Sequence, residues 1–150
     1  MSVSLGDFRG SWRITGATGP GSILGDNAYI LIGTGSPWGD SLPAFTESFQ
    51  TVVGFALIDN GQAVQLSGIP LTSGSHEGQQ PLVFLFENGY LRWSGYYNQQ
   101  PLRIFVSAAE FTKANGQRYV AVYGTTIQGD PEQVGVWGGS GSPPPEPPAP

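Results

Sequence analysis

The sequence contains no cysteine, one histidine and few charged residues, and each shortage removes a class of chemistry. Without cysteine there are no disulfides and no thiolate ligands for a metal, which fits a reducing compartment. Six Lys and Arg stand against eleven Asp and Glu, so the net charge is −5 and the basic stripe that nucleic-acid binding needs is missing. We therefore expect a protein without metal, cofactor or nucleic-acid partner.

Long apolar segments are missing as well. No run approaches the roughly 18 apolar residues of a membrane-spanning helix. Residues 1–5 lack the basic region and the apolar stretch of a secretory signal. These two absences predict a cytoplasmic protein with no membrane partner.

Glycine and aromatic residues are abundant in this chain of 150 residues. There are 23 glycines, and Phe, Trp and Tyr make up 12% of the sequence, which suits many short strands joined by tight turns. The composition changes near the end, because residues 139–150 are rich in Gly, Ser and Pro. We expect one domain over residues 1–138, followed by a flexible tail over residues 139–150.

Three Asn-Gly pairs carry most of the information about the fold, and they are Asn60-Gly61, Asn88-Gly89 and Asn115-Gly116. A type I′ turn requires positive φ at both central residues, which Asn tolerates and Gly adopts freely. Asn-Gly between two strand-like runs is therefore a strong signal for a β-hairpin. The expected strands lie near residues 8–16, 27–33, 48–58, 62–69, 81–87, 90–97, 102–112, 117–127 and 132–138.

Sequential antiparallel strands with short connections favour an up-and-down β-barrel of eight to nine strands, because closure removes the unpaired sheet edges. A β-sandwich is the alternative. In a meander of these strands, all three Asn-Gly turns are expected at one end of the barrel, together with the loop 17–26. A barrel of about eight strands has room for packed side chains or for one small ligand.

Alternation along the three hairpins assigns an inner face to each. In the first hairpin, the residues expected to point inward are Val53, Phe55, Leu57, Val64 and Leu66. In the second, they are Leu82, Phe84, Phe86, Leu91 and Trp93. In the third, they are Phe105, Ala109, Phe111, Val120 and Val122, together with Arg103, Ser107 and Arg118. Both faces of the third hairpin are half apolar, which indicates a bulge or an outer surface buried against another subunit.

Residues 10–12 (Gly-Ser-Trp) in the first expected strand resemble the Gly-x-Trp signature of the lipocalins and the wider calycin group. In that family the Trp closes one end of an eight-stranded barrel, and the first inter-strand loop is a lid over the other end. The resemblance implies these roles for Trp12 and for the loop 17–26, and the strand order agrees over residues 8–138. Two other lipocalin signatures differ, since residues 97–99 (Tyr-Asn-Gln) replace Thr-Asp-Tyr and residues 126–128 (Thr-Ile-Gln) lack the expected Arg.

No set of residues predicts a catalytic centre. His76, the single histidine, lies in a polar loop without a nucleophile-elbow sequence. Arg103 is expected inside the barrel, where a guanidinium needs an acceptor or a ligand, or at the rim with its head in water. The long loop around Trp38 and Phe45 is a candidate lid. The ligand-binding residues we predict are Trp38, Phe45, Phe84, Trp93, Tyr97 and Arg103.

Three functions remain open from the sequence. The first is a small-molecule-binding barrel that holds a largely apolar or aromatic ligand in its interior. The second, suggested by small barrels resembling calycins, is a cofactor-free cyclase of a biosynthetic pathway that acts by shape and orientation. The third is a carbohydrate-binding or interaction module that uses aromatic residues on the outer surface.

The outer surface also predicts self-association. Apolar and aromatic residues occupy both faces of the last two hairpins, and only 11% of the chain is charged. Contiguous apolar surface on a water-soluble barrel usually marks an interface. We expect a homodimer formed through the sheet face around residues 90–96 or 119–123.

Overall fold

The computed structural model describes residues 3–21, 24–26, 28–32, 45–46, 51–58, 62–63, 82–97 and 100–141. Within these ranges the elements, in chain order, are the 3-10 helix η1 (Leu5–Phe8) and the strands β1 (Gly10–Thr18), β2 (Tyr29–Ile32), β3 (Phe45–Thr46), β4 (Thr51–Ile58), β5 (Gln62–Ala63), β6 (Leu82–Glu87), β7 (Tyr90–Tyr97), β8 (Gln100–Thr112), β9 (Arg118–Gln128) and β10 (Gln133–Gly141). No helix in the described part of the chain has the length and apolar character needed to cross a membrane.

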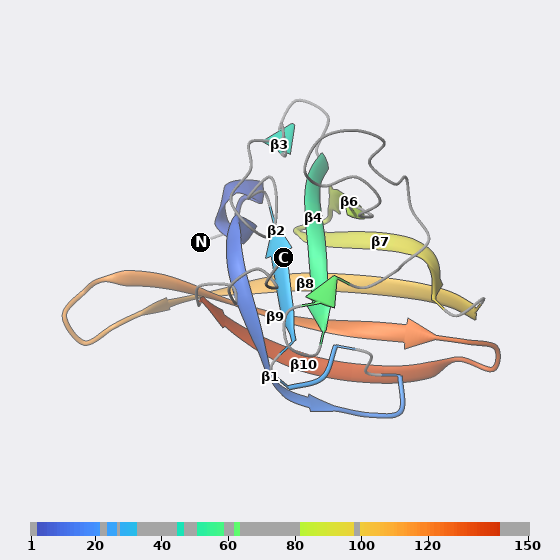
Figure 1. The fold of residues 1–150 in the computed structure, drawn as a ribbon. Helices are drawn as coiled ribbons and strands as arrows, with labels where there is room; N and C mark the ends of the chain where they lie inside the picture. Colours follow the sequence, from blue (N-terminus) through green and yellow to red (C-terminus); the bar gives the residue numbers. More distant parts are fainter. Residues whose placement is uncertain are drawn as a thin grey trace, which may run out of the picture.

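Eight of these strands form a closed antiparallel ring (Figure 1). Each pairs with its neighbour in the order β1, β2, β4, β6, β7, β8, β9 and β10, and β10 pairs back to β1. The two-residue strands β3 and β5 add pairs to β4 only. The prediction of an all-β up-and-down barrel is therefore confirmed.

Apolar side chains fill the inside of the ring in the described part of the chain. Because side chains alternate between the faces of a strand, every second residue of β6 to β10 points inward. The buried residues that pack together are Phe8, Trp12, Ile14, Leu24, Ala28, Ile30, Ile32, Leu82, Phe84, Leu91, Trp93, Leu102, Ile104, Val106, Val122 and Trp137.

Different segments cover the two ends of the barrel. At the end where β1 begins, η1 inserts the fully buried Phe8, and the Trp12 indole N–H donates a 2.7 Å hydrogen bond to the Phe8 carbonyl. At the opposite end, the turn after β1 is tied to the barrel because the buried Thr126 hydroxyl donates to the Gly21 carbonyl. The strand directions place the turns at 88–89 and 113–117 at the η1 end, and the connection from β1 to β2 at the opposite end. β4 also pairs with β5 at that opposite end, so the expectation that all three Asn-Gly turns share one end with the loop 17–26 was wrong.

The second hairpin forms as its sequence predicts. Asn88 and Gly89 have φ values of 56° and 85°, and Glu87 pairs directly with Tyr90. This is the two-residue turn with left-handed backbone at both positions. The inner face assigned to this hairpin is confirmed, because Phe84 and Trp93 are buried on the same side.

The third hairpin uses the same dipeptide differently. Gly116 has a φ of 85°, and its N–H donates to the Lys113 carbonyl at 2.9 Å, while Thr112 pairs with Arg118. The turn is therefore longer than two residues, with glycine alone in the left-handed region, as in a type I turn followed by a bulge. This change shifts the register by one residue, and a one-residue shift exchanges the two faces of a strand.

The predicted inner face of β8 was therefore wrong. The buried residues of this strand are Leu102, Ile104 and Val106, whereas Arg103 and Phe105 lie on the outside. In β9, the buried residues Val122, Gly124 and Thr126 lie opposite Ala108, Val106 and Ile104.

The inner face of β4 also differs from the prediction. Gly54 is buried and pairs with Leu82, whose side chain is in the core, so this position of β4 faces inward. The expectation had placed the alternate positions 53, 55 and 57 there, whose side chains lie outside the description. The partner of Ile58 is Gln62, one residue earlier than a two-residue turn would give, which is again a shift of register. Val64 and Leu66, assigned to the same face, lie outside the described residues.

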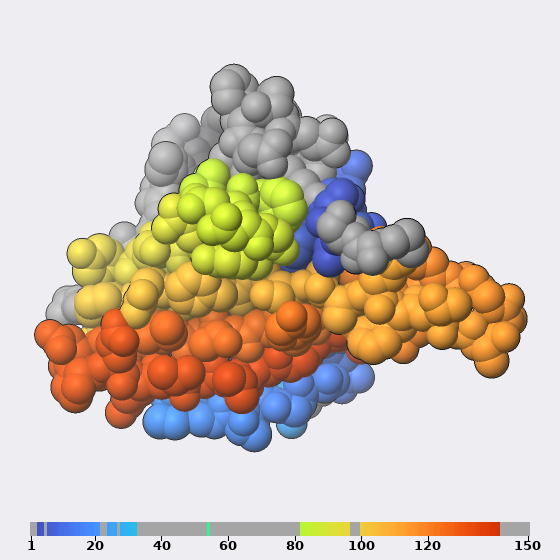
Figure 2. All heavy atoms as spheres, turned by 180° about the vertical axis from the view of Figure 1, so that it is seen from behind, coloured from blue at the N-terminus to red at the C-terminus, as the bar shows by residue number. Residues whose placement is uncertain are grey.

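The hairpin of β8 and β9 extends beyond its neighbours as a two-stranded arm. The pairing of β7 with β8 ends at Val106, and the pairing of β10 with β9 ends at Val122. Four more pairs continue from Ala109–Ala121 to Thr112–Arg118, and no other strand of the described residues lies beside them. We call residues 109–121 the arm, and its tip projects sideways from the barrel in Figures 1 and 2.

Candidate functional site

Two of the predicted ligand-binding residues belong to the core. Phe84 is fully buried and Trp93 is 7% exposed, and both lie in the cluster that fills the barrel. Phe45 and Tyr97 lie in β3 and β7, but their side chains are outside the description, as are all of Trp38 and His76. The structure therefore brings Phe84 and Trp93 together inside the barrel, and the ligand-binding role of these residues stays a prediction.

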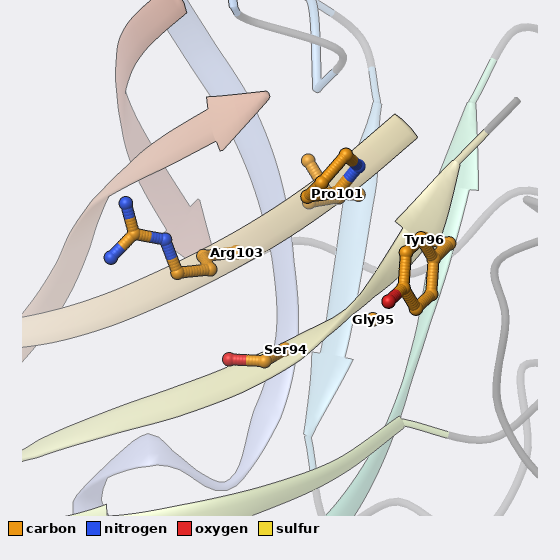
Figure 3. Close-up of a pocket in the computed structure, with 6 residues that line it drawn as sticks. Ser94, Gly95, Tyr96, Pro101 and Arg103 are labelled. Atoms are coloured by element: carbon orange, nitrogen blue, oxygen red, sulfur yellow. The ribbon is translucent and has the colours of Figure 1, made fainter. Parts of the chain in front are cut away.

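Arg103 lies on the outer surface and is already paired. Its side chain is 41% exposed, and its guanidinium donates to the Glu132 carboxylate in the turn before β10. With Ser94 and Tyr96 it lines an open hollow of about 300 Å³ between β7 and β8. Figure 3 shows the guanidinium extending away from Tyr96, so the polar groups of this hollow do not converge on one point.

Within the described part of the chain, one polar group inside the barrel makes no hydrogen bond. The Trp137 side chain is 3% exposed, and its indole N–H has no hydrogen-bond partner there. Its ring lies over Gly124 on the neighbouring strand, where an added Cβ would collide with the ring and with the Phe105 carbonyl. A buried donor without an acceptor is costly, typically by about 1–3 kcal/mol.

Exposed apolar side chains gather on the outer surface of β8, β9 and β10. Five large side chains there are exposed by 41–52%, and these are Phe111, Tyr119, Tyr123, Val134 and Val136. The pairing of β9 with β10 brings these residues close together on one face, because Tyr123 lies opposite Gly138 and Val136 lies opposite Thr125. We call the outward-facing side of these three strands the outer wall.

The middle of the outer wall carries no charge. The outward residues of β9, from Tyr119 to Ile127, are all uncharged. Charged side chains occur at the ends instead. Lys113 lies at the tip of the arm, 5.4 Å from the centre of the Tyr119 ring, and Asp130 and Glu132 lie in the turn at the opposite end.

Ion pairs hold the inner side of the arm against η1. Arg118 donates to both Asp7 carboxylate oxygens at 3.1 and 3.0 Å and to Glu110 at 2.8 Å. The hydrogen bond from Arg118, followed by one from the Ser4 backbone N–H, lowers the pKa of Asp7. The two carboxylates in turn raise the pKa of Arg118. No local pattern indicates this contact, because Asp7 and Arg118 are 111 residues apart in the sequence.

The outer side of the arm is aromatic. Phe111 and Tyr119 are direct cross-strand partners, and their rings stack with centroids 5.1 Å apart and an interplanar angle of 20°. The amino-acid pattern indicated this surface, since both faces of the third hairpin are half apolar. The register shift turned Phe111 from the expected inside to the outside.

The architecture and the site define this chain as a closed antiparallel β-barrel with an exposed aromatic outer wall. Comparisons with protein-family models, with curated proteins and with solved structures find no match.

Proposed function

We propose that this protein is a non-catalytic interaction module that binds a macromolecular partner through the outer wall. The observation that carries the proposal is the gathering of exposed Tyr119, Tyr123 and Val136 along the uncharged middle of the outer wall. Soluble proteins rarely expose contiguous apolar surface unless it serves as an interface. Tyrosine is also common at interfaces, because it combines a large apolar ring with a polar tip.

The closed barrel suits this role because it holds the wall rigid. Within the barrel, β9 is hydrogen-bonded to β8 on one side and to β10 on the other. Large core residues such as Trp137 fix the inner side of the same strands. A surface that is already ordered loses little conformational entropy on binding, so more of the contact energy appears as affinity.

A dye-binding experiment tests whether the outer wall is the principal apolar binding surface. The test variant combines Tyr123→Ser with Val136→Thr, and the control combines Tyr96→Ser with Val83→Thr. The control removes side chains that are 55% and 50% exposed, against 52% and 48% in the wall. With protein at 1 µM, the fluorescence of 8-anilinonaphthalene-1-sulfonate should fall several-fold for the wall variant and little for the control. Equal losses in both variants would contradict the proposal.

A glycan array distinguishes a protein partner of the outer wall from a carbohydrate partner. We expect no glycan to bind the wild-type protein, because stacking of aromatic rings at a protein interface accounts for the wall. Binding of a glycan that is lost with Tyr123→Ser and kept in the control variant would assign the wall to carbohydrate instead.

Binding of a small molecule inside the barrel is a second candidate, and the unpaired indole N–H of Trp137 favours it. A ligand with a hydrogen-bond acceptor would satisfy that donor, and a closed eight-stranded meander is the arrangement that the proposed calycin resemblance implies. A native mass spectrum of freshly purified protein tests this candidate. A bound small molecule that is lost with Trp137→Phe would support it, and a bare 15.9 kDa chain would count against it. The cyclase activity stays a prediction.

A further inference from the structure

The charges at the two ends of the outer wall are opposite in sign. Lys113 extends from the arm tip, and the exposed Asp130 and Glu132 lie beyond the other end of β9. Arg103 neutralises one of these two carboxylates, which leaves that end negative. Tyr123 lies midway, five positions from each end residue of β9, Arg118 and Gln128. The wall therefore has a neutral centre, one positive end and one negative end.

Two symmetric arrangements bring a pair of such walls face to face. If the twofold axis runs along the strands, Lys113 meets its own copy and the acidic turns meet each other. If the axis runs across the strands at Tyr123, the positive end of each copy meets the negative end of the other. Like charges brought together across an interface are unfavourable, so the charges select the second arrangement.

We propose that the partner of the outer wall is a second copy of this chain, docked antiparallel about a twofold axis that crosses β9 at Tyr123. This inference rests on the proposed function of the wall. An interface of this kind is self-complementary, so each contact occurs twice.

The side chains of β9 fit this arrangement. Tyr119 and Ile127 are each four residues from Tyr123, so the axis places Tyr119 of one copy over Ile127 of the other, about 13 Å from the centre at roughly 3.3 Å per residue. The cross-strand neighbours of Tyr123 are Ser107 and Gly138, which are small and leave its ring open on both sides. The two Tyr123 rings therefore meet at the centre without a bulky neighbour.

The curvature of the barrel limits the contact to the wall. In a ring of eight strands, β7 lies two strands from β9 and faces about a quarter-turn away. Tyr96 and Val83, although exposed, therefore lie outside the interface.

A charge swap tests both the partner and its orientation. Sedimentation between 1 and 200 µM should show wild-type chains of 15.9 kDa associating into dimers. Lys113→Glu should raise the dimer dissociation constant roughly tenfold or more, because the altered pair occurs twice. Asp130→Lys should do the same. The double variant should return to within about threefold of the wild type, since the pair is restored with reversed sign.

Arg13→Glu is the control, because it makes the same change in net charge on β1, outside the wall. It should leave the dissociation constant within about threefold of the wild-type value. A wild-type chain that is monomeric up to 200 µM would overturn the inference. So would a dimer whose dissociation constant is not restored in the double variant. Either result, with dye binding still lost in the Tyr123 and Val136 variant, would leave the wall as a surface for a different partner.

Discussion

Strands β9 and β10 carry two aromatic–glycine pairs side by side, and the two pairs occupy opposite faces. Trp137 lies opposite Gly124 on the inner face, and Tyr123 lies opposite Gly138 on the outer face. The Trp137 side chain is 3% exposed, because its ring lies over the space that Gly124 leaves empty. Tyr123 has the same kind of neighbour and is 52% exposed.

The difference shows which aromatic residues the fold itself requires. The ring of the inner pair is packed within one chain, since it occupies the space that Gly124 leaves empty. The outer pair leaves a large apolar ring in water, where it adds little to the stability of the barrel. We infer that the outer pair is completed by a partner.

The largest difference is expected between the two aromatic side chains. Trp137→Ala should lower the free energy of unfolding by about 3–5 kcal/mol, because it leaves a cavity in the core. Tyr123→Ala should lower it by no more than about 1 kcal/mol, since an exposed strand residue contributes little. Urea denaturation at 1 µM protein measures both values. Equal losses would mean that Tyr123 is part of the fold and not of an interface.

The two glycines give a smaller difference of the same kind. A Cβ at position 124 would collide with the Trp137 ring and the Phe105 carbonyl, so Gly124→Ala should cost about 1–3 kcal/mol. At position 138 the nearest atom to an added Cβ is the Thr15 carbonyl oxygen, 3.6 Å away, and Gly138→Ala should change stability by about 0.5 kcal/mol or less. Thermal unfolding of the two variants checks this. A larger loss for Gly138→Ala would contradict the description of the outer face.

The smallest effect concerns the arm, whose inner side is held by ion pairs instead of packing. Because the folded state lowers the pKa of Asp7, its stabilising contribution is fully present above the ordinary value of 3.8 and is lost as the pH falls through the lowered value. Asp7→Asn should therefore be less stable than the wild type at pH 6, and the difference should shrink toward pH 2.5. Faster amide hydrogen exchange in residues 109–121 should be the first sign that the Asp7 variant has lost this stabilisation of the arm. A difference that does not change with pH would contradict this role of the carboxylate.

The sequence predicted the elements of the barrel better than it predicted their faces. Asn88-Gly89 forms the expected turn, because both residues adopt the left-handed backbone that their chemistry allows. At Asn115-Gly116 only the glycine does so, because the same dipeptide also suits a longer turn with glycine alone in the left-handed region. One residue of register then moved Arg103 from the expected interior to the outside.

The same distinction applies to the candidate site. The burial of Phe84 and Trp93 follows from simple alternation beside a correctly predicted turn. The contact between Asp7 and Arg118 does not, because it depends on closure of the ring. β10 continues to Gly141, three residues past the predicted end of the domain, since residues 139–141 complete its pairing with β1.

In the proposed dimer, a second copy of the chain covers the outer wall. Nitration of tyrosine by tetranitromethane, mapped by mass spectrometry, tests it with an internal control, because Tyr123 and Tyr96 are 52% and 55% exposed in one chain. We predict that both react at similar rates at 1 µM, and that Tyr123 alone becomes protected at 200 µM. Equal reactivity of the two residues at both concentrations would contradict the account.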